Sequence, residues 1–292
     1  MPAAAPTPPT PAAEAPSPEG VPTLAAEAPS PQGSFPAAAS GDPAGVLPAP
    51  ARATRLFTGL LPAGVAVAEF AGEAPYAELA AGLFPAERAA VARAYPARRR
   101  EFAAVRSCAR AAMARLGAPP LPVLPHGEGP TWARNAPRWP EGLTGSMTHC
   151  TGYRAAALTR TGPGHPLLSL GIDAEPNAPL PDGVRSLALR PEEERALPAL
   201  TAGRPDVAWD RVVFSAKESV FKAWYPLTGR WLGFEDCRIT LTPGTTTFTA
   251  HLRTELPPPF PTTPLRGHWR LHPDPRTPLL ATAVTVARPP HP

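Results

Sequence analysis

The spacing of hydrophobic residues changes several times along the chain, and each change predicts a different kind of element. In residues 97–116 apolar side chains recur every three or four positions, which is the spacing of one buried face of a helix. The same spacing recurs in residues 209–225, where Pro226 is expected to end the helix. Shorter helices are expected at residues 85–95, which begin with proline, and at the acidic segment 191–197.

Runs of β-favouring residues, bounded by Gly and Pro, predict strands before and after each long helix. The expected strands cover residues 65–71, 143–148, 153–159, 167–173, 237–242, 245–253, 265–271 and 279–287. A long helix followed by strands therefore occurs twice, which predicts an α+β fold. No residue-level repeat accompanies this duplication. We expect an N-terminal α+β half at residues 53–165 and a C-terminal α+β half at residues 166–292.

Composition sets the first part of the chain apart. Residues 1–50 contain 14 prolines and 14 alanines but no lysine or arginine. Such a stretch cannot bury enough apolar surface to order itself, so residues 1–52 are expected to form a disordered tail. The tail lacks the basic start and apolar run of a signal peptide, and the chain has no apolar run of about 18 residues for a membrane span. A soluble, cytoplasmic protein is expected.

The net charge of +4 is unevenly distributed. Because the first 50 residues hold four acids and no lysine or arginine, the rest of the chain carries about +8, which favours a phosphate-rich or acidic partner. Nucleic acid is not expected, since the chain has no helix-turn-helix, zinc-finger or aromatic RNA-binding motif. The three cysteines, Cys108, Cys150 and Cys237, are too widely spaced to indicate a disulfide framework or a zinc cluster.

Lysine is nearly absent from the chain. Of 28 basic residues only Lys217 and Lys222 are lysines, and they lie five positions apart in the second long helix. An ammonium group is a compact charge that can reach a phosphate oxygen, so the pair suggests phosphate chemistry. The alternative is structural, because Glu218 and Lys222 have the spacing and order of a helical ion pair.

Two acids follow a predicted strand at residues 171–176, Gly-Ile-Asp-Ala-Glu-Pro. Side chains alternate along a strand, so Asp173 and Glu175 point to the same face. Two carboxylates on one face can share a Mg²⁺ ion with substrate phosphates and water. A strand that ends in acids is also often a solvated edge, and this alternative stays open.

A third motif, residues 145–153, places His149 on a predicted strand. A single strand histidine is more often structural than a ligand. The adjacent Cys150 points to the opposite face, so the two do not form a catalytic pair directly.

Taken in order, the motifs at 145–153, 171–176 and 214–236 resemble those of the 4′-phosphopantetheinyl transferases, most closely the enterobactin-synthase component D type. The arginine-rich helix at 98–110 is similar to that group as well, and the resemblance covers about residues 55 to 287. It implies two pseudo-symmetric α+β halves, each with an antiparallel sheet and a long helix. Coenzyme A lies in the cleft between such halves.

The resemblance also implies roles for individual residues. The expected contacts to coenzyme A are Arg98, Arg106, His126, Ser146, Thr148, His149, Asp173, Lys217, Lys222 and Trp231. Mg²⁺ would be held by Asp173, Glu175 and Glu218, and the expected catalytic groups are Glu218, Lys217 and Lys222. One departure is clear: the loop near 124–129 should carry a lysine, and His126 is expected to replace it.

The expected reaction is transfer of the 4′-phosphopantetheine arm of coenzyme A to a serine of apo acyl or peptidyl carrier proteins, by a monomer serving siderophore, nonribosomal peptide or polyketide synthesis. A serine hydroxyl attacks the β-phosphorus, and Glu218 accepts its proton. Two alternatives remain. The chain could bind coenzyme A without transferring it, or it could dock carrier proteins as a scaffold.

Overall fold

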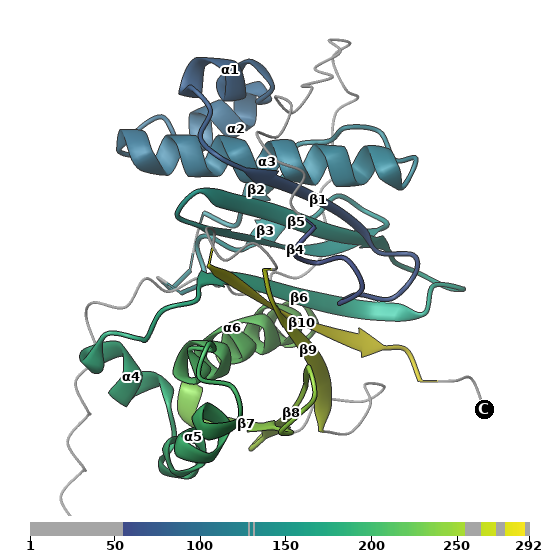
Figure 1. Cartoon of the computed structure of the whole chain (residues 1–292). Helices are drawn as coiled ribbons and strands as arrows, with labels where there is room; N and C mark the ends of the chain where they lie inside the picture. The colour runs from purple at the N-terminus through teal and green to yellow at the C-terminus, as the bar shows by residue number, and fades with distance from the viewer. Residues whose placement is uncertain (1–54, 128, 131, 255–263, 273–277, 290–292) are drawn as a thin grey trace, which may run out of the picture.

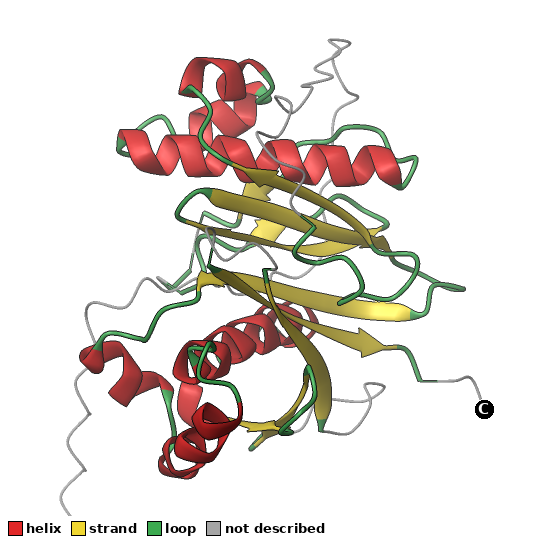
Figure 2. Ribbon diagram, viewed as in Figure 1, coloured by secondary structure: helices red, strands yellow, loops and turns green. Residues whose placement is uncertain are grey.

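Two antiparallel sheets, each covered on its outer face by helices, make up the part of the chain described by the computed structural model, residues 55–127, 129–130, 132–254, 264–272 and 278–289 (Figures 1 and 2). The helices α1 to α3 lie above the first sheet and α4 to α6 lie below the second (Figure 2). The α+β prediction is therefore confirmed.

The first sheet has the strand order β1-β5-β4. Its strands are β1 (Ala66–Ala71), β4 (Leu143–Cys150) and β5 (Tyr153–Arg160). The helices above it are α1 (Tyr76–Ala81), α2 (Pro85–Ala90) and α3 (Pro96–Arg115). The predicted apolar stripe of α3, including Phe102 and Met113, is buried with Leu158 of β5 in one hydrophobic cluster. A two-stranded ladder, β2 (Leu124–Pro125) and β3 (Pro137–Arg138), lies beside this half.

The second sheet has the strand order β6-β10-β9-β8-β7, antiparallel throughout. Its strands are β6 (Leu167–Pro176), β7 (Cys237–Leu241), β8 (Thr247–Leu252), β9 (Leu265–Leu271) and β10 (Leu279–Ala287). The helices below it are α4 (Asp182–Ala188), α5 (Pro191–Gly203), α6 (Trp209–Thr228) and the 3₁₀ turn η1 (Phe234–Asp236). The apolar face of α6, with Val220 and Trp224, forms the second core.

The two sheets meet face to face. Small side chains of β5, such as Ala155, pack against Ile172 of β6 and Ala281 of β10, and Phe57 from the segment before β1 fills the same layer. Glu69 of β1 accepts the backbone N–H groups of Leu56 and Phe57, which fixes that segment in place. The halves are therefore joined by a continuous apolar layer, and the site lies at the edge of that junction.

Two hydroxyls of β4 also tie the halves together. The Ile172 N–H donates to the Ser146 Oγ at 3.1 Å, and the Ala174 N–H donates to the Thr148 Oγ1 at 3.0 Å. The side chains thus satisfy backbone donors of β6 that no sheet ladder reaches on this side. This arrangement assigns Ser146 and Thr148 a structural role that their motif did not reveal.

Several predicted boundaries are wrong. Helix α6 continues past Pro226 to Thr228 and ends at Gly229, whose φ of 62° is in the left-handed region. Proline in the last turn removes only one hydrogen bond, and the Gly229 N–H still donates to the Tyr225 carbonyl. Helix α5 likewise runs past 197 with Pro198 inside it, and α2 stops at Ala90, short of residue 95.

Four short elements, α1, α4, β2 and β3, were not predicted, because segments of two to seven residues carry little periodic signal. The predicted tail at 1–52 lies outside the described residues. Among the described residues, no helix combines the length with the hydrophobicity that a bilayer-spanning segment requires.

Candidate active site

The candidate site forms where α6 packs against β6. Gly171 faces this helix, and a methyl group added there would come within 1.9 Å of the Ser219 carbonyl oxygen. The absent side chain lets α6 lie directly on the strand. Two positions further along β6, Asp173 points to the same face. The close approach therefore sets Glu218 and Lys222 of α6 beside an acid of the strand.

Asp173 is held by three side chains and is only 4% exposed. Its Oδ1 accepts from the Lys222 Nζ at 2.7 Å and from the Thr148 Oγ1 at 3.2 Å. Its Oδ2 accepts from the Ser215 Oγ at 2.8 Å. A carboxylate with one cation and two hydroxyl donors has a fixed orientation, so Asp173 is the anchored member of the acid group.

The two other predicted acids titrate near neutrality. Burial raises the pKa of Glu175 to about 7, and the charge of Asp173 adds to the rise even though Arg211 donates to Glu175 at 2.9 Å. Burial likewise raises the pKa of Glu218 to about 7, with Lys222 opposing the rise and the other two acids adding to it. These mutual influences indicate that all three carboxyls share one region.

The three acids are not preassembled as a metal site. Among the described residues, no group of three His, Cys, Asp or Glu side chains is arranged so that it could hold a metal ion. Asp173 and Glu175 are neutralised instead by Lys222 and Arg211. The donor set still suits a hard divalent cation, because all its ligand atoms are carboxylate oxygens and their repulsion would be relieved by one. The metal assignment stays a prediction.

The structure separates the two lysines of α6. The Lys217 Nζ donates to the Glu193 Oε2 at 2.7 Å and to the carbonyl oxygens of Ala188 and Phe234 at 2.8 and 3.0 Å. Lys217 is 2% exposed, and its three partners use its three donors. The predicted pairing of both lysines at the phosphates is therefore corrected, since only Lys222 faces the acids.

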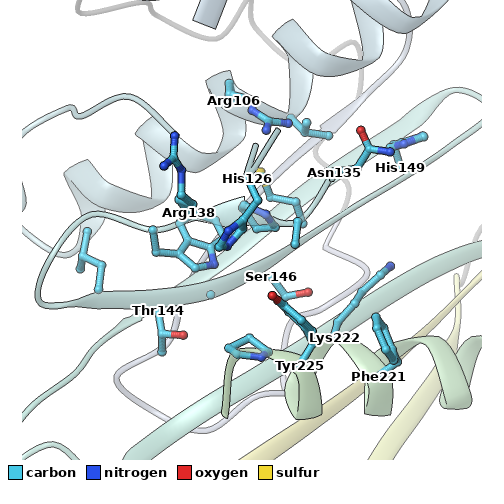
Figure 3. A pocket seen from close by; sticks show the side chains of 18 of the residues that line it. Arg106, His126, Asn135, Arg138, Thr144, Ser146, His149, Phe221, Lys222 and Tyr225 are labelled. Atoms are coloured by element: carbon cyan, nitrogen blue, oxygen red, sulfur yellow. The ribbon is translucent and has the colours of Figure 1, made fainter. Parts of the chain in front are cut away.

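A cavity of about 440 Å³ lies beside these acids, with Lys222 in its wall. Phe221, Lys222 and Tyr225 of α6 form one side, and His126 and Arg138 lie on the other (Figure 3). Four permanent cations line it: Arg98, Arg106, Arg138 and Lys222. No acid is present among its described lining residues. A cavity with these walls attracts a polyanion that also has apolar parts.

Arg98, Arg106 and His149, which the resemblance predicted to contact coenzyme A, line the cavity. The Arg98 Nη1 lies 3.4 Å from the His149 Nε2, and burial lowers the pKa of His149 to about 4, with Arg98 and Lys222 contributing. Arg106 is 4% exposed, donates to the Val123 carbonyl oxygen and lies over the Phe102 ring at 3.6 Å. His149 is therefore neutral at physiological pH, so in the cavity wall it offers a hydrogen-bonding group and no charge.

The remaining predicted residues occupy the cavity or its border. Ser146 and His126 line it, whereas Thr148 lies behind the wall on Asp173. Trp231 is 45% exposed and does not line the cavity, but its ring lies 5.3 Å from that of Phe221, which does. Trp231 is therefore next to a residue of the cavity wall but is not part of the wall.

Sequence reasoning missed Arg138, Phe221 and Tyr225, all of which line the cavity. Phe221 and Tyr225 belong to the predicted helix, and their four-residue spacing on the side of Lys222 was the available signal. Arg138 stands in a two-residue strand within a Pro/Gly-rich stretch, where no periodicity could mark it.

Comparisons with known proteins identify one family for both halves of the chain. The model of the 4′-phosphopantetheinyl transferase N-terminal domain matches residues 86–159, and that of the 4′-phosphopantetheinyl transferase superfamily matches residues 169–277. The chain is 41% identical over 227 residues to the 4′-phosphopantetheinyl transferase PptT of Mycobacterium tuberculosis, covering 73% of this chain and 94% of PptT.

Two further relatives carry the same enzyme name. The chain is 57% identical over 170 residues to Svp of Streptomyces mobaraensis, a match that covers 58% of this chain and 65% of Svp. It is 47% identical over 182 residues to Npt of Nocardia iowensis, covering 62% of this chain and 74% of Npt. The alignment with Svp thus spans slightly less than two thirds of that protein.

Proposed function

The chain belongs to the 4′-phosphopantetheinyl transferase superfamily and is an enzyme of that class, and we propose that it moves the 4′-phosphopantetheine arm of coenzyme A to a serine of apo acyl or peptidyl carrier proteins. The observation that carries this proposal is that a cavity lined by cations lies beside a group of three acids. Among the described residues, four cations and no acid line the cavity, and one of the cations, Lys222, bonds directly to the carboxylate of Asp173.

Coenzyme A suits the cavity in charge and in shape. Its diphosphate and 3′-phosphate together carry several negative charges, which match Arg98, Arg106, Arg138 and Lys222. Its adenine and pantetheine parts can lie against aromatic and aliphatic walls such as Phe221 and Trp139. A volume of about 440 Å³ is in the range of small-molecule sites.

Asp173, Glu175 and Glu218 are the residues that would hold Mg²⁺. When bound, the ion would neutralise diphosphate oxygens and draw off charge as the phosphoryl group is transferred. Loading requires the carboxyls of Glu175 and Glu218 to be ionised, and both have a pKa of about 7. It also requires Lys222 and Arg211 to give up part of their contact with the acids.

The proton chemistry falls to Glu218 and Lys222. The carrier serine oxygen forms a bond to the β-phosphorus of coenzyme A while the bond to the α-phosphate oxygen breaks, so adenosine 3′,5′-bisphosphate leaves. Glu218 accepts the serine proton, a task suited to a carboxyl with a pKa of about 7. Lys222 keeps its charge beside the acids, since Asp173 and Glu218 raise its pKa against the effect of burial, and it stabilises the leaving phosphate.

The proposal extends to assembly and partners. One chain supplies both walls of the cavity, so we propose an active monomer whose carrier substrates belong to siderophore, nonribosomal peptide or polyketide synthases. Incubation with coenzyme A, Mg²⁺ and a panel of apo carrier domains tests this. Intact mass should rise by one phosphopantetheine group on at least one carrier, and a carrier with its acceptor serine changed to alanine should not gain mass.

A different outcome would identify the alternative. If coenzyme A binds tightly in calorimetry but no carrier of the panel gains mass, the chain is a coenzyme A binding protein without transfer activity. If coenzyme A does not bind at all, the assignment of the cavity is wrong.

A further inference from the structure

Arg138 enters the cavity wall from β3, whereas the predicted cations of the wall, Arg98, Arg106 and Lys222, come from α3 and α6. It belongs to β3 and pairs with Leu124 across the short ladder. His126 follows β2, and its N–H donates to the Ala136 carbonyl oxygen, so the two side chains come from neighbouring positions of one hairpin. Figure 3 shows both on the side of the cavity opposite Lys222 and Phe221 of α6.

Arg138 differs from the other cations of the cavity in its partners. Lys222 bonds to Asp173, Arg98 lies 3.6 Å from Glu101, and Arg106 donates to a backbone carbonyl. No acid or carbonyl group in the described part of the chain pairs with Arg138. Its exposed guanidinium therefore keeps all its donors available for a ligand.

The charge of Arg138 is also felt by its neighbour. Burial lowers the pKa of His126, and the Arg138 guanidinium lowers it further. The described lining residues of the cavity include several cations and no acid. The positive charges repel one another, and a bound anion would offset this repulsion. A planar guanidinium also offers paired N–H donors that match a phosphate, which a histidine or lysine in the same place does not.

We propose that Arg138 binds a phosphate group of the nucleotide donor at the hairpin wall of the cavity, and that it rather than His126 supplies the positive charge of this loop. The inference rests on the proposed function, since it takes coenzyme A as the ligand. Arg138 would hold the donor and take no part in the bond changes, so it would set affinity and leave the rate of the chemical step unchanged.

The test compares Arg138→Gln and Arg138→Lys with Arg195→Gln. Arg195 is exposed on α5, and its one hydrogen-bond partner among the described residues is the Pro191 carbonyl oxygen of its own helix, so Arg195→Gln removes one positive charge away from the cavity. Calorimetry should give a Kd for coenzyme A about tenfold higher for Arg138→Gln, and KM should rise by a similar factor while kcat stays within about twofold. Arg138→Lys should recover part of the affinity.

A second ligand identifies the phosphate. If the tenfold difference disappears with 3′-dephospho-coenzyme A, Arg138 binds the 3′-phosphate; if it persists, Arg138 binds the diphosphate. Both results support the proposal. A Kd for coenzyme A that is the same in Arg138→Gln and Arg195→Gln, in folded proteins with equal melting temperatures, would overturn it.

Binding and transfer keep this inference separate from the proposed function. If no carrier is modified, the calorimetric comparison still decides the role of Arg138. If coenzyme A does not bind to the unsubstituted protein, both fail together. An NMR titration adds a readout that is independent of activity, because the pKa of His126 should rise in Arg138→Gln once the neighbouring charge is gone.

Discussion

Helix α6 forms two ion pairs of the same length, one buried inside the fold and one at the cavity. Lys217 lies 2.7 Å from Glu193, and Lys222 lies 2.7 Å from Asp173. The side chains of the first pair are 1% exposed each, and the ammonium group has two further carbonyl partners. Lys222 has one carboxylate partner, is 12% exposed and lines the cavity. The distance between nitrogen and oxygen therefore does not distinguish the fully buried pair from the pair at the cavity.

The two pairs differ in how many hydrogen-bond donors and acceptors each has left for a ligand. Glu193 also accepts from the N–H groups of Arg190 and Ile239, so it joins α5 to β7, an edge strand of the second sheet. Every donor and acceptor of that pair is occupied within the fold. Lys222, by contrast, has donors left over and acids around it, and a ligand can change its partners.

The largest effect is expected for Asp173→Ala. The substitution removes the carboxylate that orients Lys222 and the proposed metal ligand at once, so transfer from coenzyme A should fall by about 10³-fold or more. Intact-mass measurement of an apo carrier domain checks this. Asp173→Asn, which keeps the shape and the bond from Ser215, should be nearly as inactive. Undiminished transfer in either variant would refute the acid assignment.

A matched pair, Lys217→Met and Lys222→Met, tests the comparison directly. Lys217→Met leaves Glu193 buried without a cation, which should cost about 3 to 5 kcal/mol of unfolding free energy while the folded fraction keeps its transfer rate. Lys222→Met should lower kcat by about 10²-fold and change stability less, because Asp173 retains two hydroxyl donors. Urea denaturation and carrier modification measure the two effects.

The reverse pattern would break the comparison. If Lys217→Met loses transfer but unfolds at the same urea concentration, the buried lysine takes part in the reaction and the two faces of α6 are functionally alike.

The pH dependence follows from the raised pKa values of Glu175 and Glu218, both about 7. A carboxyl with a raised pKa is protonated below that value, and a protonated carboxyl neither accepts a proton nor binds a cation. Because both carboxyls must be ionised, kcat/KM should fall by up to about 100-fold per pH unit below about 7 and level off above it. Stopped assays between pH 5.5 and 8.5 check this.

The fall of kcat/KM below pH 7, the acid limb of the profile, has two causes: a protonated carboxyl cannot accept a proton, and it cannot bind a cation. Varying the Mg²⁺ concentration distinguishes them. Because protons and Mg²⁺ compete for the same oxygens, more Mg²⁺ should move the limb to lower pH. A limb that lies near the ordinary carboxyl pKa and ignores Mg²⁺ would contradict the assignment of Glu175 and Glu218.

The long elements could be predicted from sequence because each buries one face. The stripe of α3 and the run of β6 were recognisable from spacing alone. The β2–β3 ladder could not be, because two residues per strand give no alternation, and Arg138 was missed with it. Pro226 misled because the rule against proline inside helices is weak in a final turn whose end is closed by Gly229.

The site residues likewise divide into those that a motif could indicate and those that only the packing reveals. Asp173, Glu175 and Glu218 were proposed from their motifs, and the structure brings the three carboxyls into one region, while their role as metal ligands stays a prediction. The pairing of Lys217 with Lys222 was wrong although helix geometry warned against it, because five positions turn a side chain by about 140° around the axis. Nearness in sequence was taken for nearness in space, and only the packing of α5 reveals where Lys217 points.

The smallest effect is expected for Thr148→Val, which addresses a residue that the motif assigned to the cofactor. In the structure Thr148 accepts from the Ala174 N–H and donates to Asp173, behind the cavity wall. Loss of the hydroxyl should lower kcat about three- to tenfold by loosening Asp173, with KM for coenzyme A unchanged. Thr148→Ser keeps the hydroxyl and should be close to the unsubstituted enzyme. If KM rises while kcat holds, Thr148 of β4 contacts the donor itself, and its role is not confined to holding Asp173.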